Sequence, residues 1–285
     1  MNLKIKFASW TFALLIAGMC NLNQLQAQNS PKLSNAIFQF LPTNLPNPKV
    51  PQRYHITTDY INHTLKGDFI DKLRVSGDFT IDSPAGNEKW NNVHVAKSQK
   101  LDGLFPEGEF QSYMENFTYQ PSADILKPEF FKNFPLEALQ VRNLVWDMAG
   151  IEGFAWPHLD SLKLNQLYEA KNMNGEVELA GLGSFTNNNI QLIWKGVSMM
   201  NGKLCGLIDF RVMDNPLKVN MKMGDADFMM TGRSHYWGTI YISLSEKSLE
   251  YVELLEDVVM EIKMSNQPAP NYFYTTRFMD VKKIE

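Results

Sequence analysis

Apolar and polar residues alternate along most of the second half of the chain, and this two-residue period constrains the fold more than any other feature. Between residues 203 and 212 the even positions are mostly apolar, whereas Asp209 and Arg211 occupy the odd ones. Similar alternation occupies residues 190–195, 217–223, 239–244 and 252–264, and residues 272–284 supply a last strand. Because successive side chains of a strand point to opposite faces, each segment predicts a strand with one buried face. Residues 248–257 also fit a helical period, but the longer alternation favours a strand.

Turn signals separate these segments. Asn201-Gly202 is the strongest short hairpin signal in the chain, and residues 214–216 (Asp-Asn-Pro) predict another turn. Earlier in the chain, residues 53–62, 69–81 and 90–96 predict three further strands. The expected fold is therefore mainly β, a curved antiparallel meander that forms an open or partly closed barrel.

Residues 101–172 interrupt the pattern. Prolines and glycines break them into short elements, and aromatic side chains are frequent. Helices are expected at 123–133, with a kink at Pro128, and at 135–148. We expect a helical and loop insert that packs on or caps the sheet of a single β-rich domain, residues 53–285.

The N-terminus predicts a removable secretory signal over residues 1–27. Two lysines precede an apolar stretch at 7–19, which is too short to span a bilayer, and Ala27 is a small residue before a cleavage point. Cys20 suggests lipidation as an alternative, but Met19 fits that cleavage pattern poorly. A Pro-rich extended leader is expected at 28–51, and the mature chain has no transmembrane span. These features predict an exported protein, periplasmic or extracellular, that is soluble or loosely associated with the envelope.

Composition excludes several functions. The formal net charge is −4, with 27 basic and 31 acidic residues, which argues against binding nucleic acid or docking electrostatically on anionic lipid. Cys205 is the only cysteine after residue 27 and is expected to be a buried, inert thiol. No two of the five histidines lie at metal-ligand spacing, and no cofactor motif occurs, so neither a metal nor a cofactor is predicted. The oligomeric state is left open.

No catalytic motif is present. The weak candidates are His158 and Asp160, which lie two positions apart beside Trp156 and could form an acid–base pair. An ordinary loop anchored by the tryptophan is the favoured alternative. Asp147 with Glu152 is a further candidate for paired carboxylates.

Methionines concentrate between residues 199 and 230, which hold seven of the 15 in the chain. Flexible thioether side chains suit surfaces that accept varied apolar partners, so we expect a hydrophobic small molecule or lipid as ligand. The candidate lining residues are Trp194, Phe210, Met221, Met223, Met229 and Trp237. A core filled by methionine, or copper held by Met221 and Met223, are the alternatives.

A secretion signal, a β-meander over residues 53–284 and an aromatic insert at 101–172 together resemble the LolA-like lipoprotein carriers of bacterial envelopes. That resemblance implies a curved sheet closed by helices around acyl chains, and it carries over no functional residue. The expected function is non-catalytic binding or carriage of a hydrophobic ligand. A secreted hydrolase with its site in the insert, and a structural or assembly protein of the envelope, are the alternatives.

Overall fold

The computed structural model describes Leu41, residues 50–83 and residues 85–284. The expected signal at 1–27 and most of the expected leader at 28–51 lie outside the described residues. All the described residues belong to one compact unit, Gln39–Glu285.

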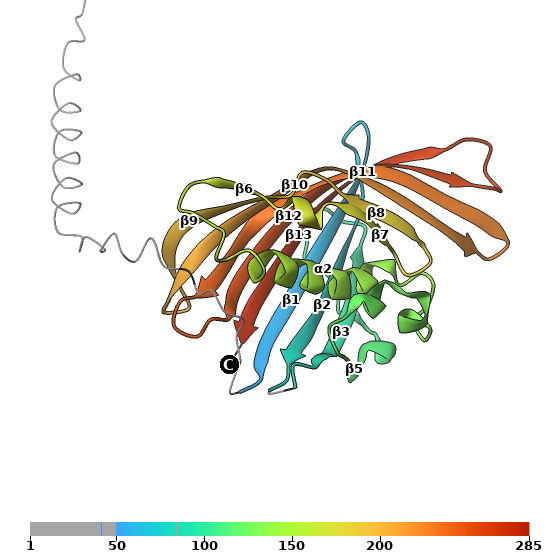
Figure 1. Cartoon of the computed structure of the whole chain (residues 1–285). Coiled ribbons are helices and arrows are strands. Elements are labelled where there is room, and N and C mark those ends of the chain that lie inside the picture. The colour runs from blue at the N-terminus through green and yellow to red at the C-terminus, as the bar shows by residue number, and fades with distance from the viewer. Residues whose placement is uncertain (1–40, 42–49, 84, 285) are drawn as a thin grey trace, which may run out of the picture. The chain divides into compact units, whose positions relative to one another are not determined.

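A single antiparallel sheet of thirteen strands dominates this unit (Figure 1). Its strands are β1 (Gln52–Thr64), β2 (Phe69–Ile81), β3 (Glu88–Ser98), β4 (Glu109–Phe110), β5 (Phe117–Tyr119), β6 (Leu167–Glu169), β7 (Gly175–Glu178), β8 (Gly183–Asn187), β9 (Gln191–Met200), β10 (Lys203–Met223), β11 (Ala226–Ser243), β12 (Leu249–Met264) and β13 (Asn271–Ile284). The order across the sheet is β4-β3-β2-β1-β13-β12-β11-β10-β8-β7, so the first long strand pairs with the last. The sheet is not closed. The predicted class, a curved antiparallel meander with a short helical insert, is confirmed.

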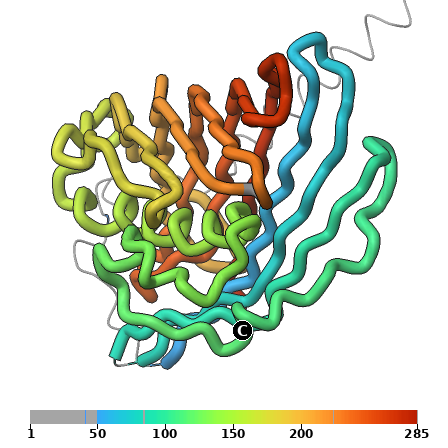
Figure 2. The backbone as a smooth tube through the Cα atoms, turned by 90° about the vertical axis from the view of Figure 1, so that its right-hand side faces the viewer, coloured from blue at the N-terminus to red at the C-terminus, as the bar shows by residue number. Residues whose placement is uncertain are grey.

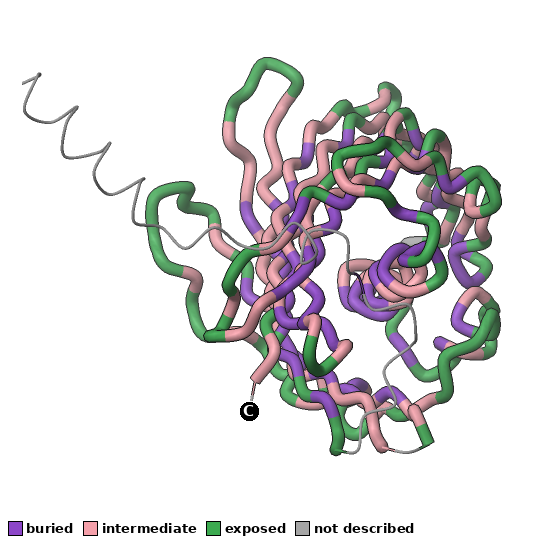
Figure 3. Tube along the Cα trace, turned by 60° about the vertical axis from the view of Figure 1, so that its left-hand side comes forward, coloured by how far each residue is buried: buried purple, intermediate pink, exposed green. Residues whose placement is uncertain are grey.

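The sheet curves around one helix, α2 (Leu139–Ala155), which lies against its inner face (Figures 2 and 3). Buried residues occur on more than one side of this helix, as expected for a helix that packs on several strands. Trp156 caps its end and Pro157, which cannot continue a helix, follows at once. The helix thus forms a second layer that covers the hydrophobic face of the sheet.

The turn predicted at residues 214–216 is wrong, because β10 continues through them. Between Val212 and Asn215 the pairing with β11 shifts, so that β10 carries one residue more than its partner, which is a β-bulge. The side-chain amide of Asn215 donates to the carbonyl oxygens of Val212 at 3.2 Å and Ser234 at 3.1 Å. The extra residue explains why the buried positions change from even numbers before the bulge to odd numbers, such as Val219, after it.

Other local predictions are confirmed. Asn201 and Gly202 have φ angles of 50° and 74° and join β9 to β10 as a hairpin, as the sequence indicates. Residues 249–264 form a strand and no helix.

The insert is less helical at its start than expected. Residues 123–133 contain two short 3₁₀ helices, Ala123–Leu126 and Pro128–Phe131, because Pro128 removes a backbone donor between them. The helix expected at 135–148 instead begins at Leu139 and ends at Ala155. Phe131 packs against neighbouring rings in this segment, at centroid distances of 4.8 Å to Phe130 and 5.5 Å to Trp146. Phe130 also contacts the rings of Phe117 and Tyr119 on β5, at 5.4 and 5.1 Å, so this aromatic cluster joins the helical part of the insert to the sheet.

Candidate functional site

Helix α2 lines two cavities with largely different side chains, and of its residues only Ala149 lines both. The cavity between the helix and strands β10 to β13, which we call the main cavity, has a volume of about 370 Å³. From α2 it receives, among others, Asn143, Asp147, Gly150 and Phe154. The second cavity has a volume of about 350 Å³ and receives Ala149, Glu152 and Gly153. These sets differ because residues three and four apart share a helix face.

Most of the main cavity is apolar. Its hydrophobic walls include Leu126, Trp146, Leu179, Leu217, Val219, Met230 and Leu254. Its volume lies within the range of about 300–1,000 Å³ that is usual for small-molecule sites. The sheet residues of this wall belong to the apolar face that the alternation in the sequence predicts. The residues of α2 form the opposite wall of the cavity.

A buried cluster of three charges forms the polar part of this cavity. Arg277 on β13 is 5% exposed and lies opposite Glu256 on β12 in the strand pairing. Its Nη1 donates to Glu256 at 3.0 Å, and its Nη2 donates to the carboxylate of Asp147 on α2. These contacts join the helix to the sheet. The cluster holds two acids and one base, so it carries one net negative charge when all three are ionised.

Neighbouring groups complete the hydrogen bonds of the cluster. Arg277 Nε donates to the Thr58 hydroxyl at 3.1 Å, and its guanidinium carbon lies 5.2 Å from the centre of the Tyr60 ring. Ser234 donates to Glu256 at 2.5 Å. The Asn143 amide donates to the Tyr60 hydroxyl at 3.1 Å. Breaking one of these contacts would leave a buried charge without its partner, and this cost opposes rearrangement of the cluster.

Burial and neighbouring charges together shift the pKa values of Asp147, Arg277 and Tyr60. It raises the pKa of Asp147, although the nearby Arg277 acts in the opposite direction. For Arg277, burial acts to lower the pKa, but Asp147, Tyr60 and Glu256 outweigh it and hold the pKa well above its usual value. Burial also raises the pKa of Tyr60 to about 12. Arg277 is therefore a permanent cation in the wall of the main cavity.

The second cavity is lined by two residues with carboxyl groups, Glu88 and Glu152. Glu88 on β3 is 2% exposed, and both it and Glu152 line the cavity with Tyr119 and Trp156. The Trp90 indole donates to the Tyr119 hydroxyl at 3.1 Å. Burial, then the charge of Glu88, raises the pKa of Glu152 to about 8. Burial likewise raises the pKa of Glu88, although a hydrogen bond with Tyr119 opposes it.

His158 and Asp160 have different hydrogen-bond partners, although the charge of Asp160 acts on His158 and opposes the lowering of its pKa by burial. His158 is 3% exposed, with Nε2 at 3.1 Å from the Met173 sulfur and Nδ1 at 3.3 Å from the Tyr168 hydroxyl. Burial lowers the pKa of His158. Asp160 is exposed and accepts a hydrogen bond from Ser161 at 3.4 Å. This placement favours the alternative interpretation, a loop anchored to the core.

Asp147 and Glu152, considered as a pair from the sequence, line different cavities. Asp147 binds Arg277, whereas Glu152 lines the second cavity with Glu88, whose charge raises the pKa of Glu152. The carboxyl pair in the structure is therefore Glu88 with Glu152.

The six predicted lining residues occupy different places. Trp194 and Phe210 are buried in the core, and Phe210 stacks on Phe154 at a ring distance of 5.4 Å. Trp237 is 36% exposed and does not line the main cavity. The side chain of Met223 lies outside the described residues.

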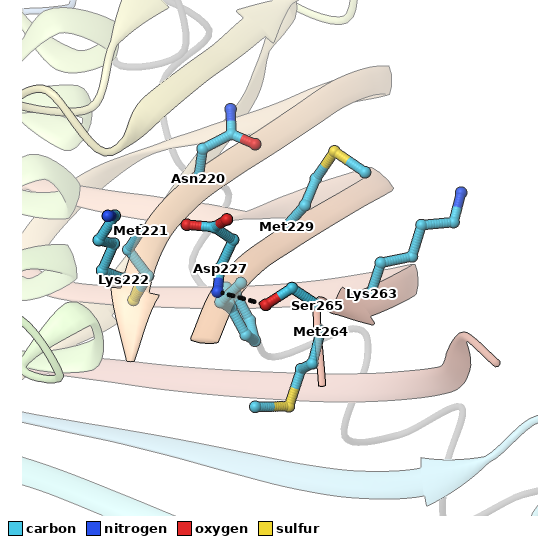
Figure 4. Close-up of a pocket in the computed structure, with 9 residues that line it drawn as sticks. Asn220, Met221, Lys222, Asp227, Met229, Lys263, Met264 and Ser265 are labelled. Carbon is cyan, nitrogen blue, oxygen red and sulfur yellow. Dashed lines mark hydrogen bonds between the residues drawn. The ribbon is translucent and has the colours of Figure 1, made fainter. Parts of the chain in front are cut away.

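Met221 and Met229 lie at a surface hollow of about 560 Å³ around the tips of β10, β11 and β12 (Figure 4). Met229 and Asn220 point to one side of these strands, and Met264 points to the other. Met229 is 41% exposed. Because both faces of these strands contribute to it, this hollow is a feature of the surface and is not walled on one side by α2, as the main cavity is.

Cys205 is buried and free, as the sequence predicts, and burial raises the pKa of its thiol to about 11. Such a thiol is a poor nucleophile at neutral pH. Within the described ranges, no three His, Cys, Asp or Glu residues gather as metal ligands.

Sequence reasoning missed Arg277, Glu256 and Glu88. The sequence did contain an indication of Arg277, which occupies an odd-numbered position of its strand, as do the buried residues Thr275 and Met279. Alternate residues of a strand share a face, so Arg277 points inward with them. A charged residue at an inward position of a strand must find a partner inside the fold. What the sequence could not show is that Asp147, 130 positions away, supplies that partner.

No model of a known protein family matches this chain, and neither does any curated protein. Over the part of the chain that the structure describes, no helix has the length and apolar character needed to cross a membrane.

Proposed function

We propose that this protein is exported and binds a hydrophobic ligand, without catalysis, in the main cavity between α2 and the sheet. The observation that carries this proposal is a largely apolar cavity of about 370 Å³ with a buried charged cluster in its wall. Sites for small lipophilic molecules combine these two features, since apolar walls supply affinity and a few polar groups orient the ligand. A lipid or similar cargo would agree with the LolA-like resemblance of the sequence.

The direct test is native mass spectrometry of the purified mature protein, with extraction of bound lipid. We expect an adduct that is lost on organic extraction. A clean mass, with no adduct after purification and after incubation with lipid extract, contradicts the proposal.

Gly150 offers a sharper test within the cavity. This glycine lines the main cavity, and a β-carbon built on it meets no atom within 4 Å. Gly150→Leu should fill part of the space and weaken ligand binding at least tenfold. Gly150→Ala is the matched control, because both changes improve helix propensity by up to about 1 kcal/mol but alanine leaves the cavity open. Equal binding by the two variants would place the ligand elsewhere.

Export has its own test. N-terminal sequencing of the protein recovered from the envelope or medium should begin at Gln28, after cleavage behind Ala27. Recovery of the full-length chain only from the cytoplasm contradicts this part of the proposal.

A secreted hydrolase is the second candidate, and the carboxyl pair of the second cavity favours it. A Glu152 with a pKa of about 8 is protonated at neutral pH and could act as a general acid while Glu88 accepts a proton. The test is hydrolysis of a panel of chromogenic glycosides and esters. This candidate requires turnover that Glu152→Gln abolishes; turnover unchanged by that variant, or no turnover, excludes it.

A further inference from the structure

The charges in the wall of the main cavity bear on which lipophilic ligands can enter it. Among the described residues that line the cavity, only Asp147, Glu256 and Arg277 are charged. A ligand with a polar head group therefore meets two carboxylates and one guanidinium.

The guanidinium of Arg277 is already engaged. Its three nitrogens donate to Thr58, Glu256 and Asp147, and Nη2 also lies 3.8 Å from the Met279 sulfur. A ligand carboxylate would have to compete with acids that the fold holds in place. It would also add a third negative charge to a site where burial strengthens electrostatic repulsion.

Acceptors, in contrast, are present at the same place. Asp147 binds Arg277 through Oδ2, and Oδ1 is a second acceptor of the same carboxylate. The Asn143 amide donates through Nδ2 to Tyr60, and its carbonyl oxygen is a further acceptor. Both residues line the cavity from consecutive turns of α2.

We propose that the main cavity selects lipophilic ligands whose head group donates a hydrogen bond, an amine or an alcohol, and rejects fatty carboxylates. This inference rests on the proposed function, because it names the ligand class of the same cavity. The Asp147 carboxylate accepts the hydrogen bond that the head group donates. The head group lies beside Asp147 and the chain extends along the apolar wall.

The test compares three probes with the same ten-carbon chain, decylamine, decan-1-ol and decanoate, by isothermal titration calorimetry at pH 7. We expect the amine and the alcohol to bind at least tenfold more tightly than decanoate. In Asp147→Asn the advantage of the amine over decanoate should shrink at least threefold, because one negative charge is removed. Glu256→Gln should also reduce the advantage of the amine over decanoate.

Asp160→Asn is the matched control, since it makes the same chemical change at an exposed acid outside the cavity, and it should leave the selectivity unchanged. Tight binding of decanoate, within threefold of decylamine, overturns this inference and leaves the proposed function intact. Selectivity that Asp147→Asn and Glu256→Gln do not alter also overturns it. If none of the three probes binds, the proposed function itself fails and the ligand class with it.

Discussion

The carboxyl pair of the second cavity makes the stability of this protein depend on pH in a way that one substitution can isolate. Glu152 has a pKa of about 8 in the folded chain, against an ordinary value of 4.5. Between these values the folded protein holds a proton that the unfolded chain has released. Stability contributed by this group is therefore complete at low pH and falls as the pH rises through the window from about 4.5 to about 8.

The size of the effect follows from the shift. At about 1.4 kcal/mol for each pKa unit, the full shift corresponds to about 5 kcal/mol. Glu152 is only partly buried, so its carboxylate can turn toward water in the second cavity, and we expect roughly half of that value, about 2–3 kcal/mol. Glu152→Gln cannot ionise, and its free energy of unfolding should exceed that of the wild type by this amount at pH 9 and match it near pH 4.5.

The assay is urea unfolding followed by circular dichroism at pH values from 4.5 to 9, with wild type and variant compared at each pH. The other titrating groups are the same in both proteins, so their contributions cancel when the two free energies of unfolding are subtracted at each pH. Glu129→Gln, at an exposed glutamate of the insert, is the control and should show no pH-dependent difference. Glu88→Gln should move the transition of Glu152 to lower pH, because one neighbouring charge is lost. A difference that is flat with pH, or that grows toward low pH, refutes the reasoning.

Three further predictions concern stability alone. Arg277→Met leaves Asp147 and Glu256 buried without their cation and should cost about 3–5 kcal/mol in urea unfolding at pH 7, with partial recovery at low pH as Asp147, whose pKa burial raises, is protonated; a cost below 1 kcal/mol contradicts the cluster. Phe131→Ala should lower the unfolding free energy by about 3–5 kcal/mol, measured in the same way, because the ring is buried among aromatic neighbours. Gly202→Ala should cost about 1 kcal/mol, because the hairpin requires a φ of 74°, and thermal unfolding should show no loss if that strain is absent.

The amino-acid sequence by itself determined most of the long strands and which side of each is apolar, but it did not predict the short strands β4, β5 and β6 within the insert. Alternation is a local property, since successive side chains of a strand point to opposite faces wherever the strand lies. For this reason β2, the Asn201-Gly202 hairpin and the strand at 249–264 could be predicted. Near residue 215 the apolar residues change from even-numbered to odd-numbered positions, and this change can be read from the sequence. A turn and a β-bulge both produce it, and only the pairing with β11 distinguishes the two.

Tertiary structure decided the candidate sites. The main cavity exists because α2 lies across the inner face of the sheet, and its charged cluster joins Asp147 to Arg277 from segments far apart in the chain. The pairing of Glu88 with Glu152 arises in the same way, since β3 and α2 meet only in the folded protein. Local patterns report the face on which a residue lies, whereas contacts between elements depend on how those faces pack, and this protein's polar groups acquire their partners, their burial and their shifted pKa values only at that stage.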